Sequence, residues 1–366
     1  MHYQKKLDEK IVLHLNKIYK KNDVENLYKN IIKSRKNGFG YINPIKFFFN
    51  SPRPIINFTK NLLKKRYKNF GFNQILIDKI FLYLEKNKNS NPLKLSNYIK
   101  KNIYSFKKDY IKKINNYIPV RYHLTHKYLM ETYNLYNHKN IIDFGAGTNS
   151  LGKIIATANK KITVTGVDIL KYNDSSKIKN LFYKKQIKSF DIPNKKIDLI
   201  ILNGVLHHVD YFSFDALLNN LSNKLNKNGK IILFEDTWNI SHNKKNNDYN
   251  IDIDINSNLK FNKLIKSYPS NVKAVNIFLE WFGILLVRNY VKMSLPYNFL
   301  SKNEWQSTFK SKNLKLVKYN NIGFFKQTLH RQSYNVLVFE KNKKIKVNNL
   351  NFIESNFYNI LNYCNL

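Results

Sequence analysis

The segment with the clearest chemical meaning is Asp143-Phe144-Gly145-Ala146-Gly147-Thr148-Asn149, which follows an apolar stretch and precedes a helical one. Two glycines at this spacing let the backbone turn tightly and approach a ligand without a clash of Cβ atoms. A dinucleotide-binding loop needs a third glycine three residues further on, where this chain has Ser150. A carboxylate two places before the first glycine suits a ligand with a cationic ammonium and a sulfonium better than it suits a pyrophosphate.

Two more acidic residues stand where they could hold a nucleoside. Asp168 ends the apolar stretch 161–168, and a carboxylate there can accept hydrogen bonds from both hydroxyls of a ribose. Asp191 and Ile192 precede the apolar stretch 197–202, where a carboxylate can accept from an adenine amino group and Ile192 can pack on the ring. Acidic residues are also common in surface loops, so Asp168 and Asp191 could be ordinary surface carboxylates.

These residues lie in a region of alternating strand and helix patterns that begins near residue 119. Short runs rich in Val, Ile and Leu predict strands, and amphipathic or apolar stretches between them predict helices. The predicted strands are 140–143, 161–168, 197–202, 230–234, 314–319 and 334–340, and the predicted helices are 151–158, 214–225 and 303–310. This alternation is typical of an α/β fold: a doubly wound, Rossmann-like, mostly parallel sheet with helices on both faces.

The rest of the chain predicts three further regions. Residues 1–118 show helical spacing and many lysines, which indicates a helical accessory region. Residues 237–300 interrupt the α/β pattern with a polar, asparagine-rich loop over 237–258 and an apolar helix over 271–293. Because this insertion follows a strand end, its helix could form a lid, although an ordinary packing helix fits the same pattern. Residues 342–366 form a basic and aromatic tail.

Together, these motifs resemble the class I S-adenosylmethionine-dependent methyltransferases, in particular their broad small-molecule-like group. The resemblance covers roughly residues 119–341 and also includes Asn203-Gly204-Val205-Leu206-His207-His208 and the turn Lys227-Asn228-Gly229. Asn149 replaces the usual third glycine, a modest departure because Asn tolerates left-handed backbone. The resemblance implies S-adenosylmethionine as cofactor, bound by Asp143, Gly145, Ala146, Gly147, Asp168, Ile169, Asp191, Ile192, Asn203 and Val205.

The sequence identifies a catalytic group less clearly than it identifies the cofactor residues. Methyl transfer from a sulfonium is an in-line displacement that depends mainly on proximity and alignment. A general base contributes when the acceptor atom carries a proton that must leave. The candidates stand at strand ends or just before the last strand: His207, Glu235 with its neighbour Asp236, and His330. Each could equally be structural or in contact with substrate.

Composition restricts the function without naming the acceptor. The chain has 366 residues, 43% of them hydrophobic, and a formal net charge of +39 from 63 Lys and Arg against 24 Asp and Glu. Such a charge attracts polyanions, but it is also what codon bias in an AT-rich genome produces. One cysteine excludes intrachain disulfides and cysteine-rich metal sites, and we assign no metal ligands. The absence of a signal peptide and of a membrane-length apolar run predicts a cytoplasmic protein.

Two kinds of acceptor remain open at this stage. A small molecule or lipid-like compound is favoured by the apolar insertion and the Leu-His-His segment. The alternative is RNA or another nucleic acid held by the basic N-terminal region, although the chain lacks the Asn/Asp-Pro-Pro-Tyr/Phe motif of enzymes that methylate base amines. A binding protein that has lost catalysis is a third possibility, opposed by the intact acidic positions. The sequence does not indicate the oligomeric state.

Overall fold

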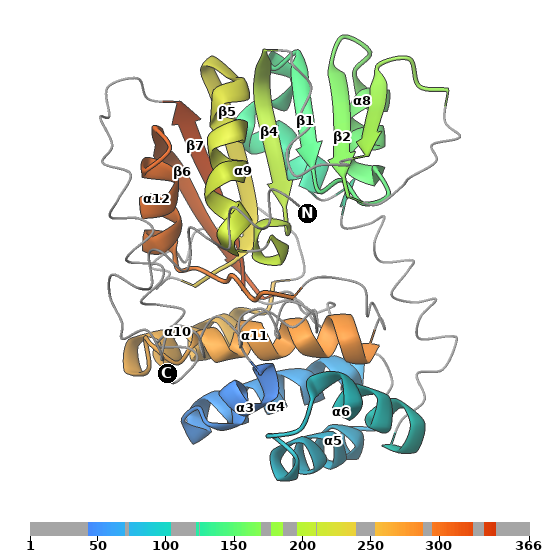
Figure 1. The fold of residues 1–366 in the computed structure, drawn as a ribbon, viewed down its shortest axis with the longest axis vertical. Helices are drawn as coiled ribbons and strands as arrows, with labels where there is room; N and C mark the ends of the chain where they lie inside the picture. The colour runs from blue at the N-terminus through green and yellow to red at the C-terminus, as the bar shows by residue number, and fades with distance from the viewer. Residues whose placement is uncertain are drawn as a thin grey trace, which may run out of the picture.

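A computed structural model gives the fold of the chain (Figure 1). It describes residues 43–69, 73–103, 122–123, 125–169, 177–185, 196–209, 211–238, 253–287, 295–324 and 333–341. These residues form two layers, an α/β layer and a helical layer that lies across one edge of its sheet (Figure 1).

The α/β layer is built on a seven-stranded sheet of order β3-β2-β1-β4-β5-β7-β6. Strands β1 to β5 run parallel to one another, and β7 is antiparallel to both of its neighbours, β5 and β6. The strands are β1 (Asn140–Phe144), β2 (Thr163–Asp168), β3 (Leu181–Lys185), β4 (Ile197–Asn203), β5 (Leu225–Asp236), β6 (Leu314–Gly323) and β7 (Tyr334–Lys341).

Alternate residues of the central strands supply two separate cores, one on each face of the sheet. On one face, Ile142 and Ile200 belong to a cluster that contains residues of α9 (Tyr211–Lys224) and α12 (Lys302–Lys310). On the other face, Ile141 belongs to a cluster that contains residues of α8 (Ser150–Ala158) and of the helical residues 125–133. Near-continuous apolar runs such as β4 are what a strand buried on both faces requires. The doubly wound, mostly parallel α/β fold is therefore confirmed.

The helical layer combines segments that lie far apart in the sequence. Its amino-terminal part consists of α3 (Pro44–Phe49), α4 (Arg53–Asn69), α5 (Ile75–Lys86), α6 (Pro92–Tyr98) and the π-helical turn η1 (Ile99–Ile103). Its second part follows β5 and consists of α10 (Ile255–Ser267), α11 (Lys273–Trp281) and the π-helical turn η5 (Phe282–Val287). Prolines at the first or second position of α3, α4 and α6 suit a helix start, where the missing N–H has no intrahelical partner.

The two parts of this layer share one apolar core. Phe48 of α3 stacks on Phe278 of α11 with ring centroids 4.0 Å apart. Lys65 of α4 donates to the buried carboxylate of Asp254, whose side chain also caps α10 by accepting from Ser257 N. The insertion and the amino-terminal helices thus pack as one layer. The domain boundaries 1–118, 119–341 and 342–366 stay predictions.

Two details differ from the sequence-based expectations. Strand β3 was not expected at all. Helix α10 begins at Ile255, inside the stretch 237–258 that was expected to be a loop, because Asp254 supplies its cap. Among the described residues, none of the helices has both the length and the apolar character needed to cross a bilayer.

The arrangement of the layers places one edge of the sheet against the helices. The parallel strands β1, β2 and β4 point their carboxyl ends toward the helical layer (Figure 1). Loops at this edge carry the ligand sites of open α/β sheets. We therefore expect the ligand site at the edge of the sheet where β1, β2, β4 and β5 end.

Candidate active site

The glycine loop after β1 is tied to the end of β2. Gly145 N and Ala146 N donate to Val167 O at 2.7 and 3.2 Å, and Gly147 N donates to Asp168 Oδ2 at 2.7 Å. Gly145 and Gly147 both have positive φ, 75° and 53°. The structure therefore brings together four of the residues predicted to bind the cofactor, and it holds the loop with backbone groups.

The two glycines differ in what surrounds them. A Cβ built on Gly145 would come within 2.1 Å of Val205 Cγ2, whereas among the described residues no atom lies within 4 Å of a Cβ built on Gly147. Gly145 is thus required by close packing against the segment after β4. Gly147 instead presents bare backbone to open space, as a loop that cradles a ligand should.

Asn149 occupies the position of the missing third glycine. Its φ of 55° is left-handed, as expected for Asn at a glycine position, and its side chain is fully buried. The side chain lies against two glycines, because a Cβ built on Gly152 or Gly166 would be 2.5 or 2.3 Å from Asn149 Oδ1. Within the described part of the chain, neither amide atom of Asn149 has a hydrogen-bond partner.

Asn203, which is also predicted to bind the cofactor, is the last residue of β4. Its Oδ1 accepts a hydrogen bond from Tyr334 OH, whereas its buried Nδ2 has no hydrogen-bond partner among the described residues. Asp143 is likewise buried, at the end of β1. A buried donor such as Asn203 Nδ2, which lacks a partner among the described residues, fits a ligand that carries hydrogen-bond acceptors.

At the end of β5, Glu235 organises the turn that follows β4. Its carboxylate is fully buried, and Oε1 accepts from Val205 N and Leu206 N at 3.0 and 2.7 Å. Oε2 lies 2.6 Å from His207 Nδ1. This carboxylate therefore fixes both the backbone of η3 (Leu206–His208) and the ring orientation of His207.

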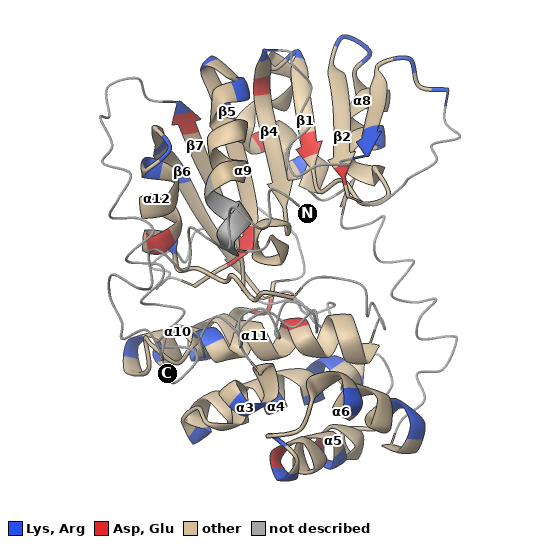
Figure 2. Ribbon diagram, viewed as in Figure 1, with Lys and Arg blue, Asp and Glu red and all other residues tan. Residues whose placement is uncertain are grey.

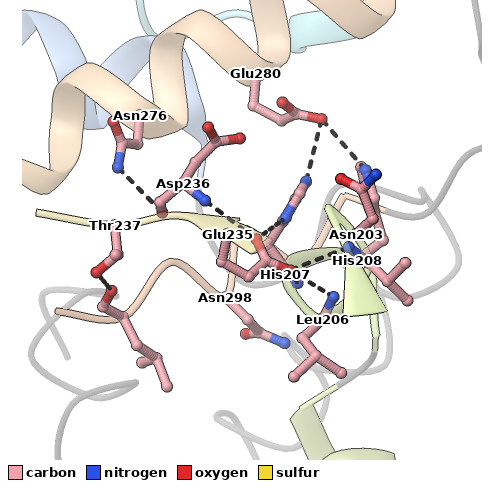
Figure 3. A network of polar contacts seen from close by, with 12 residues as sticks. Asn203, Leu206, His207, His208, Glu235, Asp236, Thr237, Asn276, Glu280 and Asn298 are labelled. Atoms are coloured by element: carbon pink, nitrogen blue, oxygen red, sulfur yellow. Dashed lines mark hydrogen bonds and ion pairs between the residues drawn. The ribbon is translucent and has the colours of Figure 1, made fainter. Parts of the chain in front are cut away.

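A second carboxylate reaches the same histidine from the helical layer. Glu280 of α11 points toward the histidine pair, and its Oε1 lies 3.6 Å from His207 Nε2 and 3.4 Å from His208 Nε2 (Figure 3). Glu280 is 5% exposed, and the ring of His207 stacks on Phe299 with centroids 4.9 Å apart. The site is thus built from both layers.

This environment changes the proton affinities of His207 and Tyr297. Burial by itself lowers the pKa of His207, but the charges of Glu235 and Glu280 and hydrogen bonds to them outweigh it and raise that pKa well above the ordinary 6.5. Burial and then the charge of Glu280 raise the pKa of Tyr297 well above its usual range. His207 therefore binds a proton strongly, and Tyr297 keeps its hydroxyl proton.

Several predicted site residues stand apart from this arrangement. Asp191, Ile192 and His330 lie outside the described residues. Ile169 is described and is 68% exposed at the end of β2. Asp236 is buried next to Glu235, and its backbone oxygen accepts from Asn276 Nδ2 at 3.3 Å. Their roles in binding or catalysis stay predictions.

Sequence reasoning missed Glu280. One signal for Glu280 was present: a carboxylate in the otherwise apolar run from Ile277 to Val287 must be buried with its neighbours. The segment 296–300, which contains Tyr297, was expected to line the acceptor site, but the left-handed φ of 56° at Tyr297 and its buried hydroxyl are visible only in the structure.

The comparisons with known proteins agree with this geometry. A family model described as a methyltransferase domain matches residues 110–318, more than half of the chain. No curated protein matches the sequence.

Solved structures similar to the chain include several methyltransferases. The Burkholderia thailandensis 1,6-didemethyltoxoflavin-N1-methyltransferase is 11% identical, with 69% of this chain and 92% of that chain covered and a TM-score of 0.41. Human N-acetylserotonin methyltransferase is 12% identical, with 70% and 62% covered and a TM-score of 0.41. The mitomycin 7-O-methyltransferase is 9% identical, with 70% and 62% covered and a TM-score of 0.40. The chain spans less than two thirds of the length of the human and mitomycin enzymes.

The family match extends over the glycine loop, the turn that carries His207, strands β1 to β5 and the first half of β6. The chain therefore belongs to the methyltransferase domain family, within the class I S-adenosylmethionine-dependent methyltransferases.

Proposed function

We propose that the chain transfers a methyl group from S-adenosylmethionine to a small-molecule or lipid-like acceptor. The observation that carries this proposal is the packing of Val205 against Gly145. It puts the glycine loop in direct contact with the segment that bears His207, two residues further on. A donor held by the loop and an acceptor held at His207 would then be neighbours, as in-line displacement requires.

The residues at the β1 and β2 ends fit the cofactor. Bare backbone at Gly147 matches the bulk of the cofactor, and the half-buried carboxylate of Asp168 matches its ribose hydroxyls. The amide nitrogen of Asn203, which has no partner among the residues that the structure describes, matches its acceptor atoms. When bound, the cofactor supplies an electrophilic methyl group. The chain's own contribution is to orient the donor and to exclude water around the acceptor.

The β4 and β5 ends supply a place for a leaving proton. Where the acceptor atom carries a proton, the neutral form of His207, which keeps its remaining proton on Nδ1 against Glu235, can take that proton at Nε2, and its raised pKa makes this form a strong base. Glu235 is fully buried and saturated by backbone donors, so it acts through His207 as a positioning residue. The acceptor would approach His207 Nε2 beside Glu280, whose Oε1 lies 3.6 Å from that nitrogen.

The character of the site favours a small acceptor over nucleic acid. Glu235, Asp236 and Glu280 place three buried carboxylates at this edge of the sheet, and such a cluster repels phosphate. Within the described ranges, Lys and Arg residues are spread over both layers and do not form one continuous basic stripe (Figure 2). The helices α11 and η5 that face the site are apolar and buried, which suits an apolar or lipid-like compound.

The test is transfer of a labelled methyl group from S-adenosylmethionine into a lysate separated into small-molecule, lipid, RNA and protein pools. We expect label in the small-molecule or lipid pool, and none with Gly145→Val as the enzyme. Label confined to RNA, with retention that falls steeply as salt rises, would overturn the acceptor assignment in favour of a nucleic acid. No label in any pool, together with no calorimetric binding of S-adenosylhomocysteine, would overturn the methyltransferase proposal itself.

A further inference from the structure

Three ligand-type side chains converge at the junction between the two layers. His207, His208 and Glu280 each offer one nitrogen or oxygen atom, and these atoms all lie within 4.8 Å of one another. We propose that they bind a divalent cation with the preferences of Zn²⁺, through His207 Nε2, His208 Nε2 and Glu280 Oε1. No metal site was expected from the sequence, because adjacent histidines gain meaning only when Glu280 is placed opposite them.

The distances suit tetrahedral coordination. Ligand atoms 2.0–2.1 Å from a tetrahedral Zn²⁺ lie about 3.4 Å apart. Glu280 Oε1 lies 3.4 Å from His208 Nε2 and 3.6 Å from His207 Nε2, which is longer than a good hydrogen bond. Both distances to Glu280 Oε1 therefore match those between ligands of one ion, and the two histidine ligand atoms lie within 4.8 Å of each other.

The surroundings of the three residues are those of a built metal site. A histidine that binds metal almost always donates its second ring N–H to a carboxylate or carbonyl, which fixes the ring. His207 Nδ1 has such a partner in Glu235 at 2.6 Å, and Glu235 is itself held by the backbone N–H groups of Val205 and Leu206. Three protein ligands leave a fourth position open, as in catalytic zinc sites.

Charge also favours a cation at this position. Glu235 and Glu280 are two buried carboxylates within reach of the same histidine, and burying charge is costly unless it is compensated. A divalent cation bound by His207, His208 and Glu280 would compensate both carboxylates.

Such an ion would also assist the proposed methyl transfer by activating the acceptor, and this role of the ion rests on the proposed function. With Zn²⁺ bound, His207 Nε2 would be a ligand and no longer the proton acceptor; an acceptor hydroxyl at the open position would instead release its proton to water, because a bound Zn²⁺ lowers the pKa of an oxygen ligand. Since His207 and His208 belong to the sheet layer and Glu280 to the helical layer, the ion would join the two layers across the acceptor site (Figure 3).

The test is isothermal titration of the chelator-treated full chain with Zn²⁺, in the absence of S-adenosylmethionine. We expect one tight site per chain, and at least a tenfold loss of affinity in His208→Gln and in Glu280→Gln. His126→Gln is the matched control: His126 pairs with Tyr136 away from the cluster, and its loss should leave the affinity unchanged. Circular dichroism of each metal-free variant checks that it is folded.

Two further measurements keep the proposal falsifiable. Titrations in buffers of different ionisation enthalpy should show that the wild-type chain releases protons as Zn²⁺ binds, because the ion displaces them. Co²⁺ should give the absorption of a tetrahedral site in wild type and lose it in Glu280→Gln. Absence of stoichiometric Zn²⁺ binding, or equal affinity in wild type, His208→Gln and Glu280→Gln, would overturn the metal site and leave the methyltransferase proposal standing.

Discussion

The two halves of the sheet's carboxyl edge are built by opposite means. At the ends of β1 and β2 the site consists of backbone: two glycines with positive φ, loop N–H groups bonded to Val167 O, and the half-buried carboxylate of Asp168. At the ends of β4 and β5 it consists of buried ionisable side chains, Glu235 and His207, facing Glu280 of the other layer.

This contrast follows from what each half has to recognise. A donor that is the same for every member of a family can be held by backbone, which leaves few side chains to vary. An acceptor and its proton need side chains whose charge and pKa can be set by their neighbours. Substitutions at the ends of β1 and β2 should therefore disturb the loop conformation and cofactor binding. Substitutions at the ends of β4 and β5 should instead disturb charge compensation and stability.

The largest effect should come from the acceptor side. Glu235→Gln removes a fully buried charge that holds His207 and two backbone N–H groups, so we expect unfolding free energy to fall by about 3–5 kcal/mol. Urea denaturation of the metal-free chain measures this. Glu85→Gln, which breaks an exposed ion pair with Arg53, should change stability by less than about 0.5 kcal/mol. Similar losses of unfolding free energy in Glu235→Gln and Glu85→Gln would contradict the importance of the buried carboxylate on the acceptor side.

On the donor side, the two glycines give a matched pair. Gly145→Ala adds both left-handed strain and a clash with Val205, and we expect a loss of about 2–4 kcal/mol in stability. Gly147→Ala adds strain alone, about 1–2 kcal/mol, because its Cβ would enter open space. Thermal and urea unfolding of the two variants measure the difference, and a Gly147→Ala loss as large as that of Gly145→Ala would contradict the packing of Gly145.

A smaller effect is expected for cofactor binding at the end of β2. Asp168→Ala removes the acceptor of the Gly147 N–H and the proposed acceptor of the ribose hydroxyls, and S-adenosylhomocysteine affinity should fall by about 1.5–3 kcal/mol. Asp168→Asn keeps an acceptor oxygen and should lose less. Calorimetric titration compares them, and unchanged affinity in Asp168→Ala would show that the ribose lies elsewhere.

The smallest and most gradual effect should come from pH. The pKa of His207 is raised in the folded chain, so its charged form stabilises folding fully below about pH 6.5 and that stability is lost as pH rises through the folded pKa. Glu235 and Glu280 face His207, with His208 and Tyr297 nearby. Urea unfolding of the metal-free chain at several pH values above 6.5 should show declining stability, and Glu280→Gln should flatten the decline. An equal decline in both would separate Glu280 from the titration.

The features that could be predicted from the sequence are those that restrict residue type locally. A turn that needs left-handed backbone selects Gly145, Gly147 and Asn149, and a strand buried on both faces selects an apolar run such as β4. These signals placed the glycine loop, the acidic end of β2 and most of the sheet. They also identified His207 and Glu235 as candidates, although not the contact between them.

The features that escaped prediction depend on packing between distant segments. Strand β3, Leu181–Lys185, is a short edge strand with half-exposed and lysine-rich residues, so its pattern carries little hydrophobic signal. Helix α10 is polar overall and acquires its position from Asp254 and Lys65. Glu280 lies 73 positions after His207, and only the fold brings their side chains together.

The shared core of the helical layer has a consequence for synthesis of the chain. Lys65 and Asp254 are 189 residues apart, and ribosomes add roughly 5–20 residues per second, so about ten to forty seconds separate the emergence of these partners. During that interval Phe48 and its neighbours on α3 and α4 can pack against Phe81 of α5 but lack the rest of their native cover, since Phe278 has not yet been made. The newborn amino-terminal helices must therefore be kept from aggregating until translation has passed α11.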